Sequence, residues 1–293
     1  MLREREGDVR KKGGVAGKTT LLPDNEWVRE VAKEDVAVDF DDEDKPVIPS
    51  EPLKTLLSLV VLVTGFIATT TSLALTHDRV PDTPPLPDIV LDTVIYQQWG
   101  LDVSEILLMV STVTAILVVL LHTHRLIILR RIWLLLGILY YYRAVTMFIT
   151  VLPKADKFYT CQPRSHNITA GLVVERVLTL ISGGGLSING KQVYCGDYIF
   201  SGHTVTLTLG YLTIKQYSPS RFFLLHWASF LTSSCGVLFL LMARGHYTID
   251  VLVAYWVSSR IWWTYHTMAN IRLVKDNQEH NMFRGLWWWH AFR

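Results

Sequence analysis

Long apolar runs with few charges constrain the fold of this chain more than any other feature. The run from Thr55 to Leu75 is uncharged over 21 residues, and the hydrocarbon core of a bilayer requires a helix of about 20 apolar residues. Further runs follow along the chain, so hydropathy predicts an all-α, multi-pass membrane protein with six transmembrane helices. The predicted spans cover residues 55–75, 106–121, 132–152, 198–214, 222–243 and 249–268.

The polar ends of the chain divide it into three regions. Residues 1–50 mix basic and acidic side chains with few large apolar residues, which is typical of a disordered tail. We therefore expect a disordered cytosolic tail at residues 1–50, a six-helix membrane domain at residues 51–269 and a cytosolic tail at residues 270–293. Residues 171–182 are apolar but contain charges and are too short to cross a bilayer, so they predict an interfacial helix.

Basic residues in the short loops predict the orientation of the spans. Arginines between the second and third spans, with Lys215 and Arg221 between the fourth and fifth, place these loops and both termini in the cytosol. The opposite face is then lumenal or extracellular. It receives a candidate glycan acceptor, Asn167, and two cysteines, Cys161 and Cys195, that could form a disulfide in an oxidising compartment.

Two histidines lie where predicted spans begin. His203 stands near the start of the fourth apolar run and His246 precedes the sixth, and the two intervening spans return the chain to the same membrane face. Asp250 follows His246 by four residues, a spacing that on a helix lets the carboxylate hold one ring nitrogen and leave the other free. These three residues suit nucleophilic attack with proton transfer. A pair of interfacial histidines with a helix-capping aspartate is the alternative.

The residues around these histidines resemble the signature blocks of the sphingomyelin synthase family. Residues 195–204, CGDYIFSGHT, and residues 246–266, HYTIDVLVAYWVSSRIWWTYH, resemble two of its blocks, and residues 85–88 and 130–143 resemble two earlier ones. The resemblance runs in order over about residues 77–275. It implies six membrane helices, a lumenal or extracellular active site, kinship with the lipid phosphate phosphatases, and catalytic roles for His203, His246 and Asp250.

The resemblance also implies a reaction. In it, phosphocholine passes from phosphatidylcholine to ceramide, through a phosphohistidine on His246 with His203 exchanging protons, and sphingomyelin and diacylglycerol are formed. No cofactor and no metal are implied. The alternatives are a ceramide phosphoethanolamine synthase, a lipid phosphatase or phospholipase C-type hydrolase, and a ceramide-binding membrane protein without activity.

The expected partners are lipids of the lumenal or outer leaflet. They are ceramide and phosphatidylcholine or phosphatidylethanolamine, within the lipid bilayer of the Golgi membrane and/or the plasma membrane. The formal net charge of +2 gives no reason to expect a nucleic-acid partner. Formation of a homo-oligomer is left open.

Four further residues are expected to line the substrate site. Arg143, within the third span, suits phosphate through its planar guanidinium, with a structural pairing to Asp197 or Glu105 as the alternative. Glu105, at the entrance of the second span, could line the same cavity. Asp197 and Tyr247 are near the histidines in the sequence and complete the set of expected substrate-binding residues.

One position departs from the family pattern and bears on the headgroup. Family members usually have an acidic residue immediately before the nucleophilic histidine, and here Gly245 takes that place. Gly245 leaves room for the bulkier choline group and removes an acceptor that would attract either cation. Because a quaternary ammonium favours aromatic faces, which nearby tyrosines could supply, we expect choline as the main headgroup and ethanolamine as the second.

Overall fold

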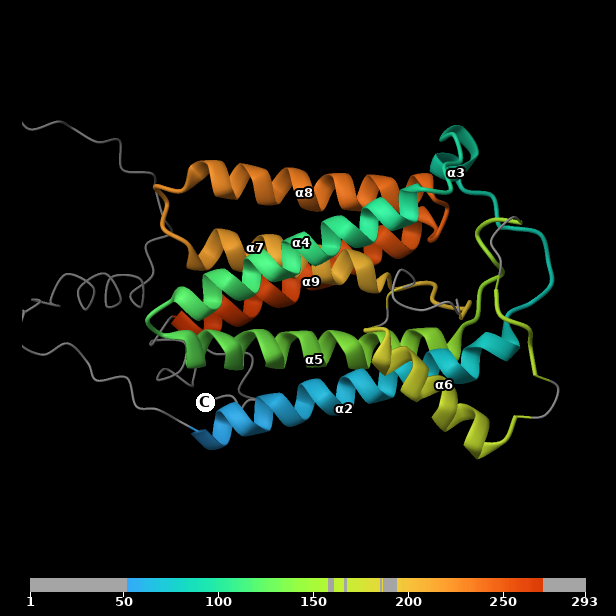
Figure 1. Cartoon of the computed structure of the whole chain (residues 1–293), viewed down its shortest axis with the longest axis horizontal. Helices are drawn as coiled ribbons and strands as arrows, with labels where there is room; N and C mark the ends of the chain where they lie inside the picture. Colours follow the sequence, from blue (N-terminus) through green and yellow to red (C-terminus); the bar gives the residue numbers. More distant parts are fainter. Residues whose placement is uncertain (1–51, 158–160, 166–167, 185, 187–193, 271–293) are drawn as a thin grey trace, which may run out of the picture. The chain divides into compact units, whose positions relative to one another are not determined.

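A computed structural model describes residues 52–157, 161–165, 168–184, 186 and 194–270. Every regular element in these ranges is helical (Figure 1). The predicted tails at residues 1–50 and 270–293 lie outside the described residues apart from Asn270, as does Asn167. An all-helical fold is therefore confirmed for the described part of the chain.

Each apolar run predicted from hydropathy contains a helix, and two short helices lie between the first and second runs. The elements are α2 (Pro52–Thr76), η1 (His77–Arg79), α3 (Ile89–Thr93), α4 (Gly100–Leu121), α5 (Arg125–Ile149), α6 (Ala170–Ser182), α7 (Gly202–Tyr217), α8 (Phe223–Met242) and α9 (Thr248–Asn270). The helix predicted at residues 171–182 is α6, which begins one residue earlier, and its location at the membrane interface stays a prediction.

Four of the helices are long and apolar enough to cross a membrane. They are α2 together with η1, α4, α5 and α8. The helix α7 has 16 residues, or about 24 Å at 1.5 Å per residue, less than a bilayer core of about 30 Å. The helix α9 has 23 residues but carries serine, threonine, arginine and histidine side chains. The six predicted spans thus correspond to four clear candidates.

The packing of α7 among its neighbours, and of one face of α9 against α7, explains the mixed composition of these two helices. Phe200 and Val205 at the start of α7 pack with Leu135 and Leu139 of α5, and with Trp262 and Ala254 of α9, in the main hydrophobic core. A helix covered by other helices needs no continuous apolar surface, because its polar groups are satisfied within the protein.

The helices α2 and α5 pack closely because each has a glycine at the contact. A Cβ atom on Gly65 would lie 2.7 Å from the carbonyl oxygen of Gly137, and one on Gly137 would lie 2.8 Å from the backbone of Val61. Nearer the end of α2, the Ser72 hydroxyl donates to the carbonyl of Ala144 over 2.8 Å. Small residues and interhelical hydrogen bonds are the usual means of helix association in a membrane.

Three predicted boundaries are corrected by the structure. The helix α4 begins at Gly100 rather than at residue 106, so Glu105 lies inside the helix instead of at its entrance. The helix α5 runs from Arg125 to Ile149, seven residues ahead of the predicted start. Residues 198–201 precede α7 instead of belonging to it. In α4, hydropathy started the span after Glu105, whereas the helix retains Ser104 and Glu105 because their side chains are buried inside the protein.

The loop between the first two predicted spans is partly buried. His77 and Val80 at its start and Leu91 in α3 are all buried. This loop lies at the same end of the helices as the starts of α4, α7 and α9, so it covers the region where the histidines are found.

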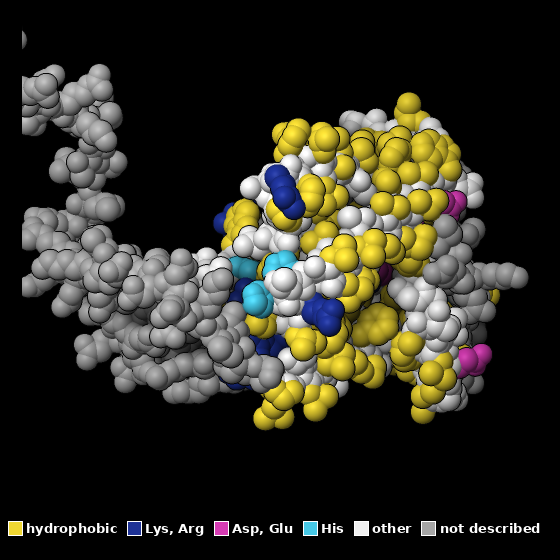
Figure 2. Space-filling model, turned by 60° about the vertical axis from the view of Figure 1, so that its left-hand side comes forward, with side chains coloured by type: hydrophobic (Ala, Val, Ile, Leu, Met, Phe, Trp, Pro, Cys, Tyr) yellow, Lys and Arg dark blue, Asp and Glu magenta, His cyan; other side chains and the backbone are white. Residues whose placement is uncertain are grey.

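The two ends of the long helices differ in charge (Figure 2). In the described ranges, every aspartate and glutamate lies at the end where α4, α7 and α9 begin. At the opposite end, His122 after α4 lies 6.2 Å from Tyr217 of α7, measured between ring centroids. The turns there carry Arg125, Lys215 and Arg221, all exposed.

Candidate active site

His203 is held at the start of α7 and faces a carboxylate from α4. The Ser201 side chain accepts the Thr204 N–H over 3.3 Å and caps the helix, which places His203 in its first turn. His203 is 14% exposed, and its Nε2 lies 3.5 Å from Oε1 of Glu105, which is 1% exposed. A buried carboxylate at this distance can orient the imidazole ring.

His246 lies in the turn before α9, beside Asp250. Its Nδ1 is 3.4 Å from Oδ2 of Asp250, and the aspartate is fully buried. Neither histidine makes a hydrogen bond of good geometry with its carboxylate. Catalytic hydrogen bonds often shorten only when a substrate is bound. The pairing of each ring with one carboxylate is therefore compatible with a catalytic role despite the long distances.

The helical relationship predicted between His246 and Asp250 is wrong. The helix α9 begins at Thr248, so His246 lies outside it and the two residues do not share a helix face. The Asp250 carboxylate instead accepts the N–H of Tyr247 over 2.9 Å and the N–H of Ile199 over 2.7 Å. These bonds bring Asp250 to His246 and also tie the start of α9 to the segment before α7.

The two imidazole rings lie together. The ring centroids of His203 and His246 are 6.0 Å apart and the ring planes meet at 63°. This confirms the prediction that both histidines lie at the same end of the helices, although 43 positions separate them in the sequence. The pair is flanked by Glu105 on one side and Asp250 on the other.

The backbone beside this pair contains a left-handed residue. Ile199 has a φ of 73°, a conformation that is strained for a β-branched side chain. Its N–H donates to Asp250, and the backbone N–H of Ser201 lies 3.4 Å from the Asp250 carbonyl oxygen. A strained backbone conformation persists only where surrounding contacts enforce it, and such conformations are more frequent at functional sites than elsewhere.

Arg143 is paired with Asp197 in this structure. Its Nε donates to Oδ1 over 3.1 Å and its Nη2 contacts Oδ2, so the guanidinium binds the carboxylate through two atoms. This is the structural pairing that the sequence left open, and a phosphate contact of Arg143 stays a prediction. Burial alone would raise the pKa of the Asp197 carboxyl, but the Arg143 guanidinium and the nearby His246 hold it below its usual value of 3.8.

Tyr247 is a packed residue with its hydroxyl in use. It is 2% exposed, and its ring lies 5.6 Å from that of Tyr198. The hydroxyl accepts the N–H of Leu86 over 3.1 Å and donates toward the carbonyl of Pro153 over 3.2 Å. A role for Tyr247 in binding substrate stays a prediction, and the contacts it makes hold loops together.

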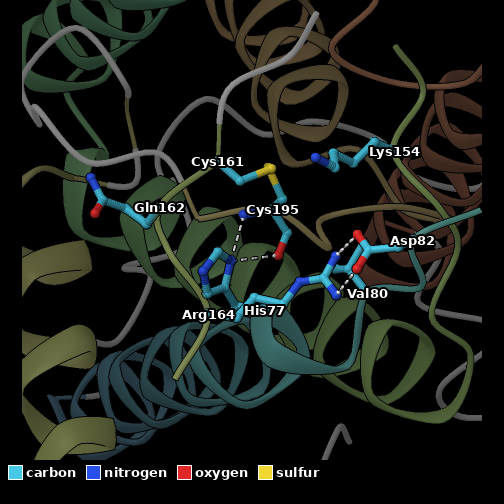
Figure 3. Close-up of a pocket in the computed structure, with 8 residues that line it drawn as sticks. All are labelled: His77, Val80, Asp82, Lys154, Cys161, Gln162, Arg164 and Cys195. Atoms are coloured by element: carbon cyan, nitrogen blue, oxygen red, sulfur yellow. Dashed lines mark hydrogen bonds and ion pairs between the residues drawn. A yellow bond between two sulfur atoms is a disulfide. The ribbon is translucent and has the colours of Figure 1, made fainter. Parts of the chain in front are cut away.

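A disulfide joins Cys161 to Cys195, two positions before Asp197. His77 supports the same segment, because its Nδ1 accepts the Cys195 N–H over 3.0 Å. These residues line an open pocket of about 210 Å³, together with the ion-paired Arg164 and Asp82 (Figure 3). The lining of this pocket includes neither of the paired histidines.

Sequence reasoning missed two relationships at the site. Glu105 was expected to line a cavity but not to pair with His203, and Asp88 was noticed only within a family block. No sequence signal links Glu105 to His203, since 98 positions separate them. The two hydrogen bonds from Thr248 to Asp88 likewise join segments that lie 160 positions apart.

Comparison with known proteins bears on this arrangement. The family model described as "PAP2 superfamily C-terminal" matches residues 194–267. This range contains both histidines and Asp250. The chain is 44% identical over 251 residues to phosphatidylcholine:ceramide cholinephosphotransferase 1 of Caenorhabditis elegans, covering 82% of this chain and 54% of the relative. It is 38% identical over 264 residues to the Homo sapiens protein of that name, covering 89% and 64%.

A second human relative decides the family. Phosphatidylcholine:ceramide cholinephosphotransferase 2 of Homo sapiens is 39% identical over 253 residues, which cover 85% of this chain and 69% of the relative. The chain belongs to the phosphatidylcholine:ceramide cholinephosphotransferase family. The resemblance to sphingomyelin synthases is thereby confirmed. The chain spans 54% of the Caenorhabditis elegans member and 64% of the first human member.

Proposed function

We propose that this chain transfers phosphocholine from phosphatidylcholine to the primary hydroxyl of ceramide, forming sphingomyelin and diacylglycerol. The family supports the substrates, because its members are named for this reaction. The observation that carries the chemistry is the pair of histidines with ring centroids 6.0 Å apart, each beside its own carboxylate.

In the first step, His246 acts as the nucleophile. Its Nδ1 faces Asp250, so the proton stays on that nitrogen and Nε2 offers its lone pair to phosphorus. A bond forms between Nε2 and phosphorus while the bond from phosphorus to the diacylglycerol oxygen breaks. His203 gives its proton to that leaving oxygen. The product is a phosphohistidine that carries the choline headgroup.

In the second step, ceramide takes the headgroup. Its primary hydroxyl attacks phosphorus, its proton passes to His203, and the bond between phosphorus and His246 breaks. Both histidines return to their starting states, so the cycle consumes no cofactor. Glu105 lies 3.5 Å from Nε2 of His203 and orients this ring for both proton transfers.

The membrane setting of the site is part of the proposal. All six predicted spans cross the bilayer: the four apolar helices, and with them α7 and α9, which share a hydrophobic core with α5. The basic turns at Arg125, Lys215 and Arg221 face the cytosol. The histidine end then faces the lumen of the Golgi or the cell exterior, where the Cys161–Cys195 disulfide is stable.

Cysteine labelling tests this orientation. In a Cys235→Ser background, an impermeant reagent added to sealed Golgi vesicles should label Ser220→Cys in the α7–α8 turn and leave Thr83→Cys in the α2–α4 loop protected. Both positions are exposed. Labelling of Thr83→Cys with protection of Ser220→Cys would reverse the orientation.

The activity test uses purified protein in vesicles with labelled ceramide and one donor at a time. With phosphatidylcholine, labelled sphingomyelin should appear together with an equal amount of diacylglycerol. Ceramide phosphoethanolamine from phosphatidylethanolamine would identify the second headgroup. Release of phosphocholine without sphingomyelin would show that the protein is a hydrolase and not a transferase. His226→Ala serves as a control variant that should keep full activity.

A further inference from the structure

The Asp88 carboxylate accepts four hydrogen bonds and joins two helices. Its Oδ1 accepts the N–H of Val90 over 3.0 Å and of Leu91 over 3.2 Å, which makes it the N-cap of α3. The same atom accepts the hydroxyl of Thr248 over 2.7 Å, and Oδ2 accepts the Thr248 N–H, also over 2.7 Å. One side chain therefore caps α3 and the first residue of α9 together.

The position of Thr248 gives these bonds their importance. Thr248 is the first residue of α9 and follows His246 by two positions. His246 itself belongs to no helix, because α8 ends at Met242 and a short turn follows. The direction of the His246 side chain is therefore set by how firmly the next few residues are held.

Those residues are held from two sides. Asp250 bonds the segment before α7, through the N–H of Ile199. Asp88, in the loop between α2 and α4, accepts hydrogen bonds from Thr248 at the start of α9. The Tyr247 hydroxyl accepts the N–H of Leu86 in that same loop. Without the Asp88 bonds, Thr248 would lose its own link to this loop, and the start of α9 would keep the Asp250 bonds and the contacts of Tyr247. A displacement of about 1 Å at a reacting group can lower a rate by about a hundredfold.

We propose that Asp88 is a positioning residue, which fixes His246 for attack on phosphorus by clamping Thr248 at the start of α9. The proposal rests on the proposed function and assigns a role to residues 85–88, the block before the second apolar run. Charge agrees with this role. Burial alone would raise the pKa of Asp88, but the bonds from Thr248 lower it, so the carboxylate is ionised and a strong acceptor at neutral pH.

A local clamp is distinguished from a general stabilising cap by chemical modification of individual histidines. Diethyl pyrocarbonate is applied to purified protein, and modified peptides are quantified by mass spectrometry against exposed His124 as the internal reference. In Asp88→Asn, the rate at His246 should rise at least about threefold, because the buried ring becomes accessible. The rate at His203, which is held by α7 and not by Thr248, should stay unchanged.

Matched variants complete the design. Asp82→Asn removes a carboxylate from the same loop, where it pairs with the exposed Arg164, and should leave His246 unchanged. Thr248→Val removes the hydroxyl bond and should shift His246 in the same direction as Asp88→Asn, whereas Thr248→Ser keeps both bonds and should resemble the wild type. If Asp88→Asn does not fold, the threonine pair carries the test.

The transfer assay gives the second readout. Asp88→Asn should lower kcat by about tenfold to a hundredfold and leave KM for phosphatidylcholine within about twofold, since the substrate contacts remain. Equal modification rates at His246, or an equal rise at His203, would overturn the clamp. A wild-type protein without transfer activity would instead overturn the proposed function, and the modification rates would still decide the clamp.

Discussion

Arg143 of α5 lies directly against Gly202, the first residue of α7. A Cβ atom on Gly202 would be 2.5 Å from Nη1 and 2.8 Å from the central carbon of the guanidinium. The missing side chain of Gly202 thus leaves the space in which Arg143 reaches Asp197. Since His203 is the next residue, this contact also fixes the backbone position from which the His203 side chain extends.

Gly202→Ala should lower transfer activity by at least about tenfold. The added methyl group must displace the guanidinium, the start of α7 or both, and overpacking of this kind costs about 1–3 kcal/mol. The measurement is kcat together with the thermal midpoint in detergent. Gly171→Ala is the control, because a Cβ there meets nothing within 4 Å. Unchanged activity in Gly202→Ala would show that the contact is not needed.

Acid stability should depend on the ion pair between Arg143 and Asp197. The pKa of Asp197 is lowered in the folded protein, so its contribution to stability is complete above the unfolded value of about 3.9 and is lost as the pH falls through the folded pKa. Arg143→Gln leaves burial unopposed and should raise the folded pKa. The midpoint of acid unfolding should therefore move to higher pH.

The control for the acid-unfolding experiment is a variant of a second ion-paired arginine. Arg164→Gln disrupts an ion pair with Asp82, whose side chain is 76% exposed, and should leave the midpoint unchanged. Unfolding followed by circular dichroism between about pH 2 and pH 6 measures both. A midpoint in Arg143→Gln that coincides with the wild type would contradict the prediction.

The histidine pair and its carboxylates should act as a unit. His203→Ala, His246→Ala and Asp250→Ala should each lower kcat by at least about a thousandfold, and double variants should lose little more, because removing one member disables the rest. Glu105→Gln should lose less, since it acts through His203. Gel filtration and proteolysis would establish that the variants are folded. Full activity in any single variant would remove that residue from the mechanism.

Gly245→Glu should lower the ratio of choline to ethanolamine product. The site tolerates a side chain, because a Cβ would lie at ordinary contact distances, the nearest being 3.5 Å from Leu240. A carboxylate there offers ethanolamine an acceptor and takes space from choline. Gly245→Gln, of similar size without charge, separates the two effects. An unchanged ratio in both variants would mean that position 245 does not select the headgroup.

Hydropathy and residue spacing predicted a large part of this protein. The apolar runs located every long helix in the described ranges, with boundaries that were least accurate where charged residues such as Glu105 and Arg125 lie near the start of a helix. Two histidines separated by two apolar runs were expected at the same end of the helices, and their rings lie together. This succeeded because two consecutive helices joined by a short turn run antiparallel and return the chain to the end where it started.

The sequence alone therefore determined the helices, the common end of the histidines and the family. The tertiary structure decided the partners: Glu105 for His203, Asp197 for Arg143, and Asp88 for Thr248. It also showed that Asp250 reaches His246 from outside a shared helix face, with its carboxylate held by two backbone N–H groups. Apolar periodicity is a local property of the chain, whereas a buried charge is satisfied by whichever group the packing brings within a few ångströms. Asp88 and Thr248 meet across 160 positions for that reason.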